Sequence, residues 1–175
     1  MSRSPSHCPL EIEAHCLYTA FYLDSKLDTS GDWMPKKTAR ERLHKECDLP
    51  KVKPAPEKWG GGLMLIAHPT DFDALMRAVP KGKVVTVVQL RETLATRHNA
   101  DMCCPLTAGI FVNIAAAASE EDRLDAREEM TPYWRTLKKG GELNPKFPGG
   151  VLNHKALLET EGHVVIQKNE SGSLW

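Results

Sequence analysis

The sequence lacks an excess of either charge, a long apolar run and a regular set of cysteines. Its 23 basic residues balance its 23 acidic residues, so a nucleic-acid-binding surface would have to be a local patch. The longest apolar run near the start, residues 16–23, is about a third of a membrane span. The five cysteines are odd in number and irregularly spaced, which argues against a secreted disulfide framework. We therefore expect a cytoplasmic protein that does not use a membrane.

Sequence motifs for several kinds of site are also missing. No glycine-rich loop followed by Lys and Ser or Thr is present, so nucleotide hydrolysis has no support. His7, Cys8, His15 and Cys16 have side chains that can bind metals, but their spacing matches no zinc-finger pattern and no second ligand pair follows. We therefore predict no metal site and no cofactor.

The chain divides into two parts. Residues 1–58 have scattered apolar residues and a basic stretch punctuated by Pro50, Pro54 and Pro56, which predicts a flexible or loosely packed extension. From residue 59 the apolar pattern sharpens, so residues 59–175 are predicted to form one folded domain. The predicted fold is mainly α with small β elements, in a monomeric protein.

The first helices of this domain follow a predicted buried strand at 63–66. Thr70 is the expected N-cap of the first helix. Thr86 and Gln89 form a capping-box pattern that begins the second helix. Pro105 suits the first turn of a third, longer helix, and this pair of helices resembles a helix-turn-helix.

The later elements are predicted from weaker patterns. Ser119 and Asp122 resemble another capping box, which predicts a separate, solvated, acid-rich helix through Met130. Residues 151–161 are expected to form a helix. Residues 163–167 are expected to form a final strand.

The most informative stretch is Pro-Tyr-Trp-Arg at 132–135, followed by Gly-Gly at 149–150 and Glu-Gly-His at 161–163. This combination resembles the active-site block of the alkylguanine-DNA alkyltransferases. Residues 79–84 resemble that family's approach to its helix-turn-helix. The resemblance covers about half of the chain and implies a winged helix-turn-helix-like domain similar to the family's C-terminal domain.

The residues that do the chemistry in that family are replaced here. The family's block reads Pro-Cys-His-Arg, in which the Cys takes an alkyl group from damaged guanine and the His helps to generate its thiolate. Tyr133 and Trp134 stand in their places. A phenol with an ordinary pKa of about 10 stays protonated, and an indole has no basic lone pair. Pro132, Arg135 and Glu161 keep the family's frame, but without the His, Glu161 has nothing to orient, so we predict no catalytic residue.

The resemblance implies binding without catalysis. Alkyltransferase-like proteins, a branch that lacks the acceptor Cys, bind alkylated guanine without repairing it and mark it for other repair proteins. The chain is therefore expected to be a non-enzymatic binder of double-stranded DNA, with alkylated guanine and repair proteins as its partners. The family's arginine finger would fall at Leu106, which could act as an apolar wedge or lie in the core. Tyr133 and Trp134 could stack on an extruded base or pack the interior.

The expected DNA contacts fall into two groups. Phosphate contacts are expected from five basic residues: Lys81, Lys83, Lys138, Lys139 and Lys146. Groove contacts are expected from the paired helices, through Gln89, Leu106, Thr107 and Asn113.

Two alternatives stay open at the level of the sequence. In the first, the fold is kept as a protein-interaction module, and the acidic segment 120–129 and the basic extension contact partners. In the second, Cys103 or Cys104 acts in alkyl transfer or redox chemistry, because a helix N-terminus favours a thiolate. His98 is the nearest histidine in sequence to these thiols. A buried structural role for both cysteines is the plainer interpretation.

Overall fold

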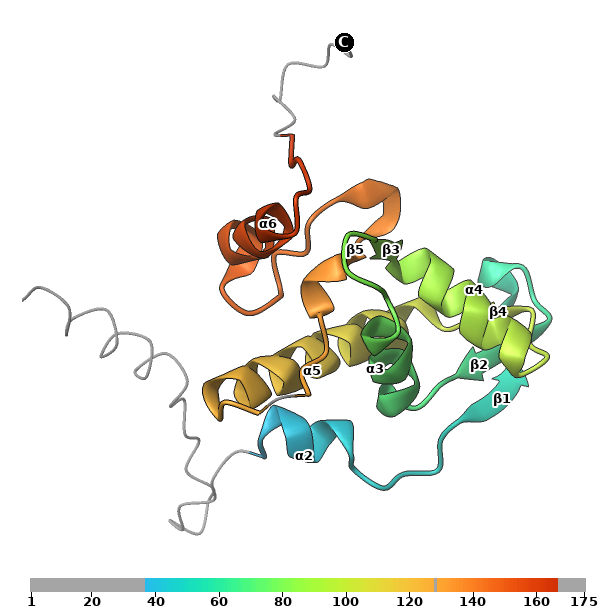
Figure 1. Cartoon of the computed structure of the whole chain (residues 1–175). Coiled ribbons are helices and arrows are strands. Elements are labelled where there is room, and N and C mark those ends of the chain that lie inside the picture. The colour runs from blue at the N-terminus through green and yellow to red at the C-terminus, as the bar shows by residue number, and fades with distance from the viewer. Residues whose placement is uncertain (1–36, 128, 167–175) are drawn as a thin grey trace, which may run out of the picture. The chain divides into compact units, whose positions relative to one another are not determined.

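The computed structural model describes residues 37–127 and 129–166, and all of them from Thr38 onward belong to one compact unit. Figure 1 shows a mainly helical fold with small groups of strands, so the predicted mainly α class with small β elements is confirmed. The helices are α2 (Ala39–Leu43), α3 (Pro69–Arg77), α4 (Val87–Arg97), α5 (Pro105–Leu124) and α6 (Gly150–Thr160). The short 3-10 helices are η1 (Glu57–Trp59), η2 (Tyr133–Arg135) and η3 (Lys139–Gly141).

The strands form two small sheets. Their bounds are β1 (Lys51–Pro54), β2 (Leu63–Ile66), β3 (Val85–Thr86), β4 (Met102–Cys103) and β5 (Thr136–Leu137). In the first sheet β2 is central, antiparallel to β1 and parallel to β4. In the second, β3 and β5 pair in parallel, with Val85 opposite Thr136. The predicted strand at 63–66 is confirmed as β2.

Helix α5 supplies the centre of the core, and α2, α3 and α4 all pack against it. Ala115 and Ala116 of α5 are fully buried, and their small side chains allow neighbouring helices to approach closely. Phe72 and Met76 from α3 and Leu94 from α4 fill the space around them.

Local signals set the starts of α4 and α5 as predicted. The Thr86 hydroxyl accepts a hydrogen bond from the Gln89 amide at 3.3 Å, and the Gln89 side chain accepts one from the Thr86 amide at 2.8 Å. Pro105 occupies the first turn of α5, where its missing N–H is not needed. Helix α6 matches the predicted helix at 151–161 within one residue at each end.

The described part of segment 1–58 is not a loosely packed extension. Ala39 and Leu43 of α2 are buried in the core, at 2% and 4% exposure. The Glu121 carboxylate of α5 accepts the Ala39 amide at 2.7 Å, so it satisfies a free N–H at the start of α2. Strand β1 pairs with β2. The folded unit therefore begins earlier than the predicted boundary.

Helix α5 is longer than predicted, and the separate acid-rich helix is absent from the described residues. The helix continues through Ser119 to Leu124. The Ser119 hydroxyl does not cap a new helix, because it donates to the Thr131 carbonyl at 2.6 Å. Glu120 is buried at 5% exposure rather than solvated.

Two smaller predictions are also wrong. His68, not Thr70, is the N-cap of α3: its ring accepts the Thr70 amide at 3.3 Å, and Asp71 accepts the His68 amide at 2.9 Å. Residues 163–166 form no strand and line a groove instead. Gln167 lies outside the described residues.

Candidate DNA interface and altered active-site block

Tyr133, which the resemblance aligns with the family's acceptor Cys, lies in the core with 1% of its surface exposed. We call residues 132–135 the altered block. Its ring meets those of Trp134 and Phe147 edge-on, at centroid distances of 5.5 and 5.4 Å. Its hydroxyl donates to Glu120 Oε2 at 3.2 Å and accepts from Asn153 Nδ2 at 3.3 Å. Of the two alternatives for Tyr133, the structure therefore supports interior packing, because a buried ring has no face to offer to a base.

Trp134 is half-buried and hydrogen-bonded at both its indole and its backbone. The indole N–H donates to Glu161 Oε1 at 2.8 Å. The Trp134 carbonyl accepts from Nε2 of the buried His154 at 2.8 Å, while His154 Nδ1 accepts the Asn144 amide. The expectation that Glu161 has nothing to orient is wrong, since it accepts the Trp134 indole N–H.

Arg135 completes a tight ion pair with Glu161. Its Nε lies 2.9 Å from Glu161 Oε2 and its NH2 lies 2.8 Å from Oε1, so the two side chains meet fork to fork. The third Arg135 nitrogen, NH1, donates to the Val79 carbonyl at 2.6 Å, and Glu161 also accepts the Gly82 amide at 3.2 Å. The pair thus connects η2, the end of α6 and the turn before β3.

Glu161 is held in its ionised form by its hydrogen-bond donors. Burial raises the pKa of this carboxyl, but the hydrogen bonds from Arg135, Trp134 and Gly82 and the Arg135 charge outweigh burial and lower it to about 2. A carboxylate with this pKa holds no proton near neutral pH and is too weak a base to accept one. Glu161 is therefore a fixed negative charge rather than a proton relay.

The two adjacent thiols are both buried, Cys103 at 1% and Cys104 at 5% exposure. Burial raises the pKa of the Cys103 thiol. At Cys104, the N-cap residue of α5, burial acts in the same direction, but hydrogen bonds from Thr107 and the Leu106 amide outweigh it and lower the pKa. No hydrogen bond joins either thiol to a histidine, including His98, within the described residues. The structure does not assemble a thiol with a base here.

Leu106 and Ile110 form an exposed apolar stripe on the first turns of α5. Their exposed fractions are 66% and 56%, while Ala108 and Val112 on the opposite face are fully buried. The alternative that Leu106 lies in the core is therefore wrong. We call Leu106 and Ile110 the α5 stripe.

The backbone near each end of the α5 stripe approaches a segment that carries an exposed lysine. Asn113, one turn after Ile110, accepts from Asn144 Nδ2 at 2.9 Å, and Asn144 in turn accepts the Lys146 amide at 3.1 Å. At the other end, the Cys104 amide donates to the Leu65 carbonyl of β2 at 2.9 Å, and Lys53 of β1 lies opposite Met64, the neighbour of Leu65. Because Lys53 falls within the predicted loose extension, sequence reasoning missed it.

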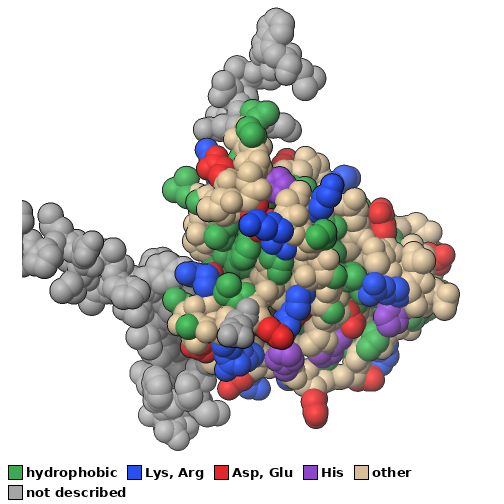
Figure 2. Space-filling view, viewed as in Figure 1, with side chains coloured by type: hydrophobic (Ala, Val, Ile, Leu, Met, Phe, Trp, Pro, Cys, Tyr) green, Lys and Arg blue, Asp and Glu red, His purple; other side chains and the backbone are tan. Residues whose placement is uncertain are grey.

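The other predicted contacts are only partly free to bind DNA. Within the described residues, Lys81, Lys83, Lys139 and Lys146 are exposed and form no ion pair, whereas Lys138 pairs with Glu142 at 3.3 Å. The predicted polar groove contacts use part of their capacity internally: Gln89 bonds Thr86, Thr107 donates to the Cys104 carbonyl, and Asn113 accepts from Asn144. In Figure 2 the basic side chains are spread among hydrophobic ones, so no single block of positive charge appears on this face.

The acidic segment 120–129 is bonded largely within the protein. Arg40 forms ion pairs with Asp122 and Asp125, and Arg127 lies 3.7 Å from Asp122. Glu121 caps the start of α2. The start of α2 and the end of α5 are therefore bound to one another, while Asp125 and Glu129 keep 58% and 89% of their side chains exposed, so the interaction-module alternative stays a prediction.

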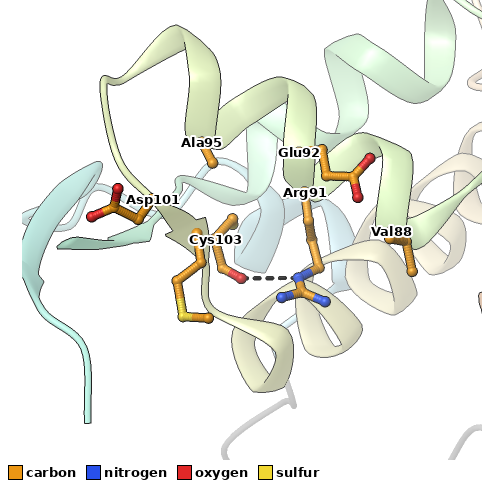
Figure 3. Close-up of a pocket in the computed structure, with 7 residues that line it drawn as sticks. Val88, Arg91, Glu92, Ala95, Asp101 and Cys103 are labelled. Carbon is orange, nitrogen blue, oxygen red and sulfur yellow. Dashed lines mark hydrogen bonds between the residues drawn. The ribbon is translucent and has the colours of Figure 1, made fainter. Parts of the chain in front are cut away.

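Two hollows lie away from the altered block. Figure 3 shows a small open pocket of about 200 Å³ between α4 and β4, where Arg91 Nε donates to the Cys103 carbonyl at 2.9 Å beside Glu92 and Asp101. A wider apolar groove of about 770 Å³ lies between η3 and α6. Neither is lined by Tyr133 or Trp134, so neither is a base pocket at the altered block.

Comparisons with protein-family models, with curated proteins and with solved structures give no match. Among residues 37–127 and 129–166, no helix is long and apolar enough to cross a membrane. Over the same range, no group of three or more His, Cys, Asp or Glu side chains could hold a metal ion.

Proposed function

We propose that this protein binds double-stranded DNA without modifying it, through a winged helix-turn-helix-like surface built on α4 and α5. The observation that carries the proposal is the α5 stripe, with Leu106 66% exposed in the first turn of a helix whose opposite face is core. In this proposal Lys53 and Lys146, carried by the segments that approach the two ends of the stripe, contact phosphates on either side of a groove. An aliphatic side chain at such a place inserts between base steps and partly unstacks them.

The wedge also supplies a physical basis for a preference for damaged DNA. Unstacking costs least where the base pair is already weakened, as it is at an alkylated guanine. A protein that inserts Leu106 therefore binds an alkylated site more tightly without a pocket for the base. A wedge on α5 needs no base pocket at Tyr133, so it agrees with the burial of that residue. The preference for a lesion then comes from α5 rather than from the altered block. Repair proteins that follow such a marker are the partners implied.

Fluorescence anisotropy with a labelled duplex, with and without one alkylated guanine, tests the proposal at low salt. We expect the alkylated duplex to bind about tenfold more tightly, which corresponds to about 1.4 kcal/mol. Leu106→Ser should abolish this preference. Lys53→Ala with Lys146→Ala should weaken both duplexes alike and reduce the slope of log K against log salt by about 1.8, since each phosphate contact contributes about 0.9.

Lys155→Ala is the matched control, because Lys155 lies on α6 in an exposed pair with Glu159 and should change neither quantity. Absence of binding to either duplex at low salt by the wild-type protein contradicts the proposed function. Equal binding to both duplexes contradicts the lesion preference alone. Retention of a preference by Leu106→Ser contradicts the wedge.

A further inference from the structure

The Glu161–Arg135 pair holds a turn that carries two exposed lysines. In the turn 80–83, the Lys83 amide donates to the Pro80 carbonyl at 3.1 Å, and Gly82 has φ +75°. This positive φ at the third position is typical of a turn that needs glycine there. Lys81 and Lys83 lie on either side of Gly82, and both are exposed.

The same ion pair anchors both ends of this turn. Arg135 NH1 donates to the carbonyl of Val79 at 2.6 Å, just before the turn, and Glu161 Oε2 accepts the amide of Gly82 at 3.2 Å. The side chains of the pair are only 13% and 7% exposed. We call Glu161, Arg135 and their bonds to Val79 and Gly82 the clasp. Since its guanidinium and carboxylate also bond each other in a fork, neither anchor can move without the other.

We infer that the clasp is a positioning device that holds Lys81 and Lys83 in place to contact DNA phosphates. The inference rests on the proposed function and extends it to residues of the altered active-site block. A loop that is ordered before binding loses less conformational freedom when DNA arrives, so its contacts contribute more to affinity. In the clasp, Arg135 and Glu161 position the turn 80–83, a role that needs neither a thiol nor a base.

Glu161→Gln tests the clasp, because the amide cannot form the charged fork with Arg135. We expect weaker duplex binding and a salt slope reduced by up to about 1.8, the value for two phosphate contacts. Glu159→Gln is the matched control: it is the same change on the last turn of α6, at a side chain 48% exposed, and should leave the slope unchanged. Arg135→Lys is a second test variant that keeps the charge but cannot bond Val79 and both Glu161 oxygens together.

The lysines separate positioning from general stability. In a Lys81→Ala, Lys83→Ala background, Glu161→Gln should have no further effect on affinity, whereas a merely unfolded protein would lose affinity in either background. Hydrogen exchange of the unliganded protein adds an independent readout: Glu161→Gln or Arg135→Lys should lose protection at the Gly82 amide while α5 keeps its own.

Each outcome bears on one claim. If the wild-type protein does not bind DNA, the proposed function fails and the role of the clasp in DNA binding fails with it. If Gly82 keeps its protection in both Glu161→Gln and Arg135→Lys, the clasp does not order the turn and the inference alone is overturned. If the wild-type protein binds but the lysine double variant binds equally well, the clasp inference is overturned and the proposed function stands. The same holds if Glu161→Gln behaves like Glu159→Gln. If Glu161→Gln does not fold, the same measurements on Arg135→Lys support or overturn the clasp.

Discussion

Replacing Tyr133 by alanine measures how deeply the altered block is built into the core. The side chain is 1% exposed and packs edge-on between Trp134 and Phe147, so its removal leaves a cavity that these rings cannot fill without shifting. Large aromatic truncations in cores cost about 3–5 kcal/mol. We therefore expect a loss of about 4 kcal/mol, a large part of the roughly 5–15 kcal/mol that stabilises a typical domain.

Tyr133→Phe divides this loss between the ring and the hydroxyl. It keeps the ring and removes the bonds to Glu120 and Asn153. A hydrogen bond to a charged group contributes about 1.5–3 kcal/mol, so we expect a loss of about 2 kcal/mol. Glu120 keeps its bonds to Arg123, which limits the damage.

Urea denaturation followed by far-UV circular dichroism gives both values. Leu152→Ala is the control: this residue is 81% exposed, and we expect a change within about 0.5 kcal/mol. A Tyr133→Ala variant as stable as this control would refute the reasoning, because it would mean that the Tyr133 ring is on the surface and available to a base.

Three further predictions follow from the fold and its charges. Leu43→Ala should destabilise the protein by about 2–5 kcal/mol in the same assay, because α2 belongs to the core; a negligible change would support the loose extension instead. The free energy of unfolding should fall as pH falls from about 4.5 towards 2, because the interactions that lower the pKa of Glu161 stabilise the fold only while its carboxyl is ionised. Denaturation at pH 7, 4 and 3 should show a smaller fall for Glu161→Gln than for the wild-type protein. Iodoacetamide should modify the exposed Cys47 well before Cys103, as followed by peptide mass mapping, and equal rates would contradict the burial of Cys103.

Much of the local structure could be predicted from short patterns. The capping box of Thr86 and Gln89, the start of α5 at Pro105 and the strand β2 all depend on residues within a few positions of one another. The resemblance to the alkyltransferase block also directed attention to Arg135 and Glu161, which the structure brings together. Their joint hold on Val79 and Gly82 could not be predicted, because no periodicity reports a contact between a side chain and a distant backbone group.

The sequence by itself determined where α4 and α5 begin, and that Tyr133 and Trp134 cannot perform thiolate chemistry, because capping and ionisation are properties of single residues and their near neighbours. Only the tertiary structure decided that Ser119 lies within α5, that α2 joins the core and that Tyr133 is buried. The first two depend on bonds between residues 12 and 82 positions apart, Ser119 to Thr131 and Ala39 to Glu121. A capping pattern is local, and it loses to a distant partner that satisfies the same polar group inside the fold.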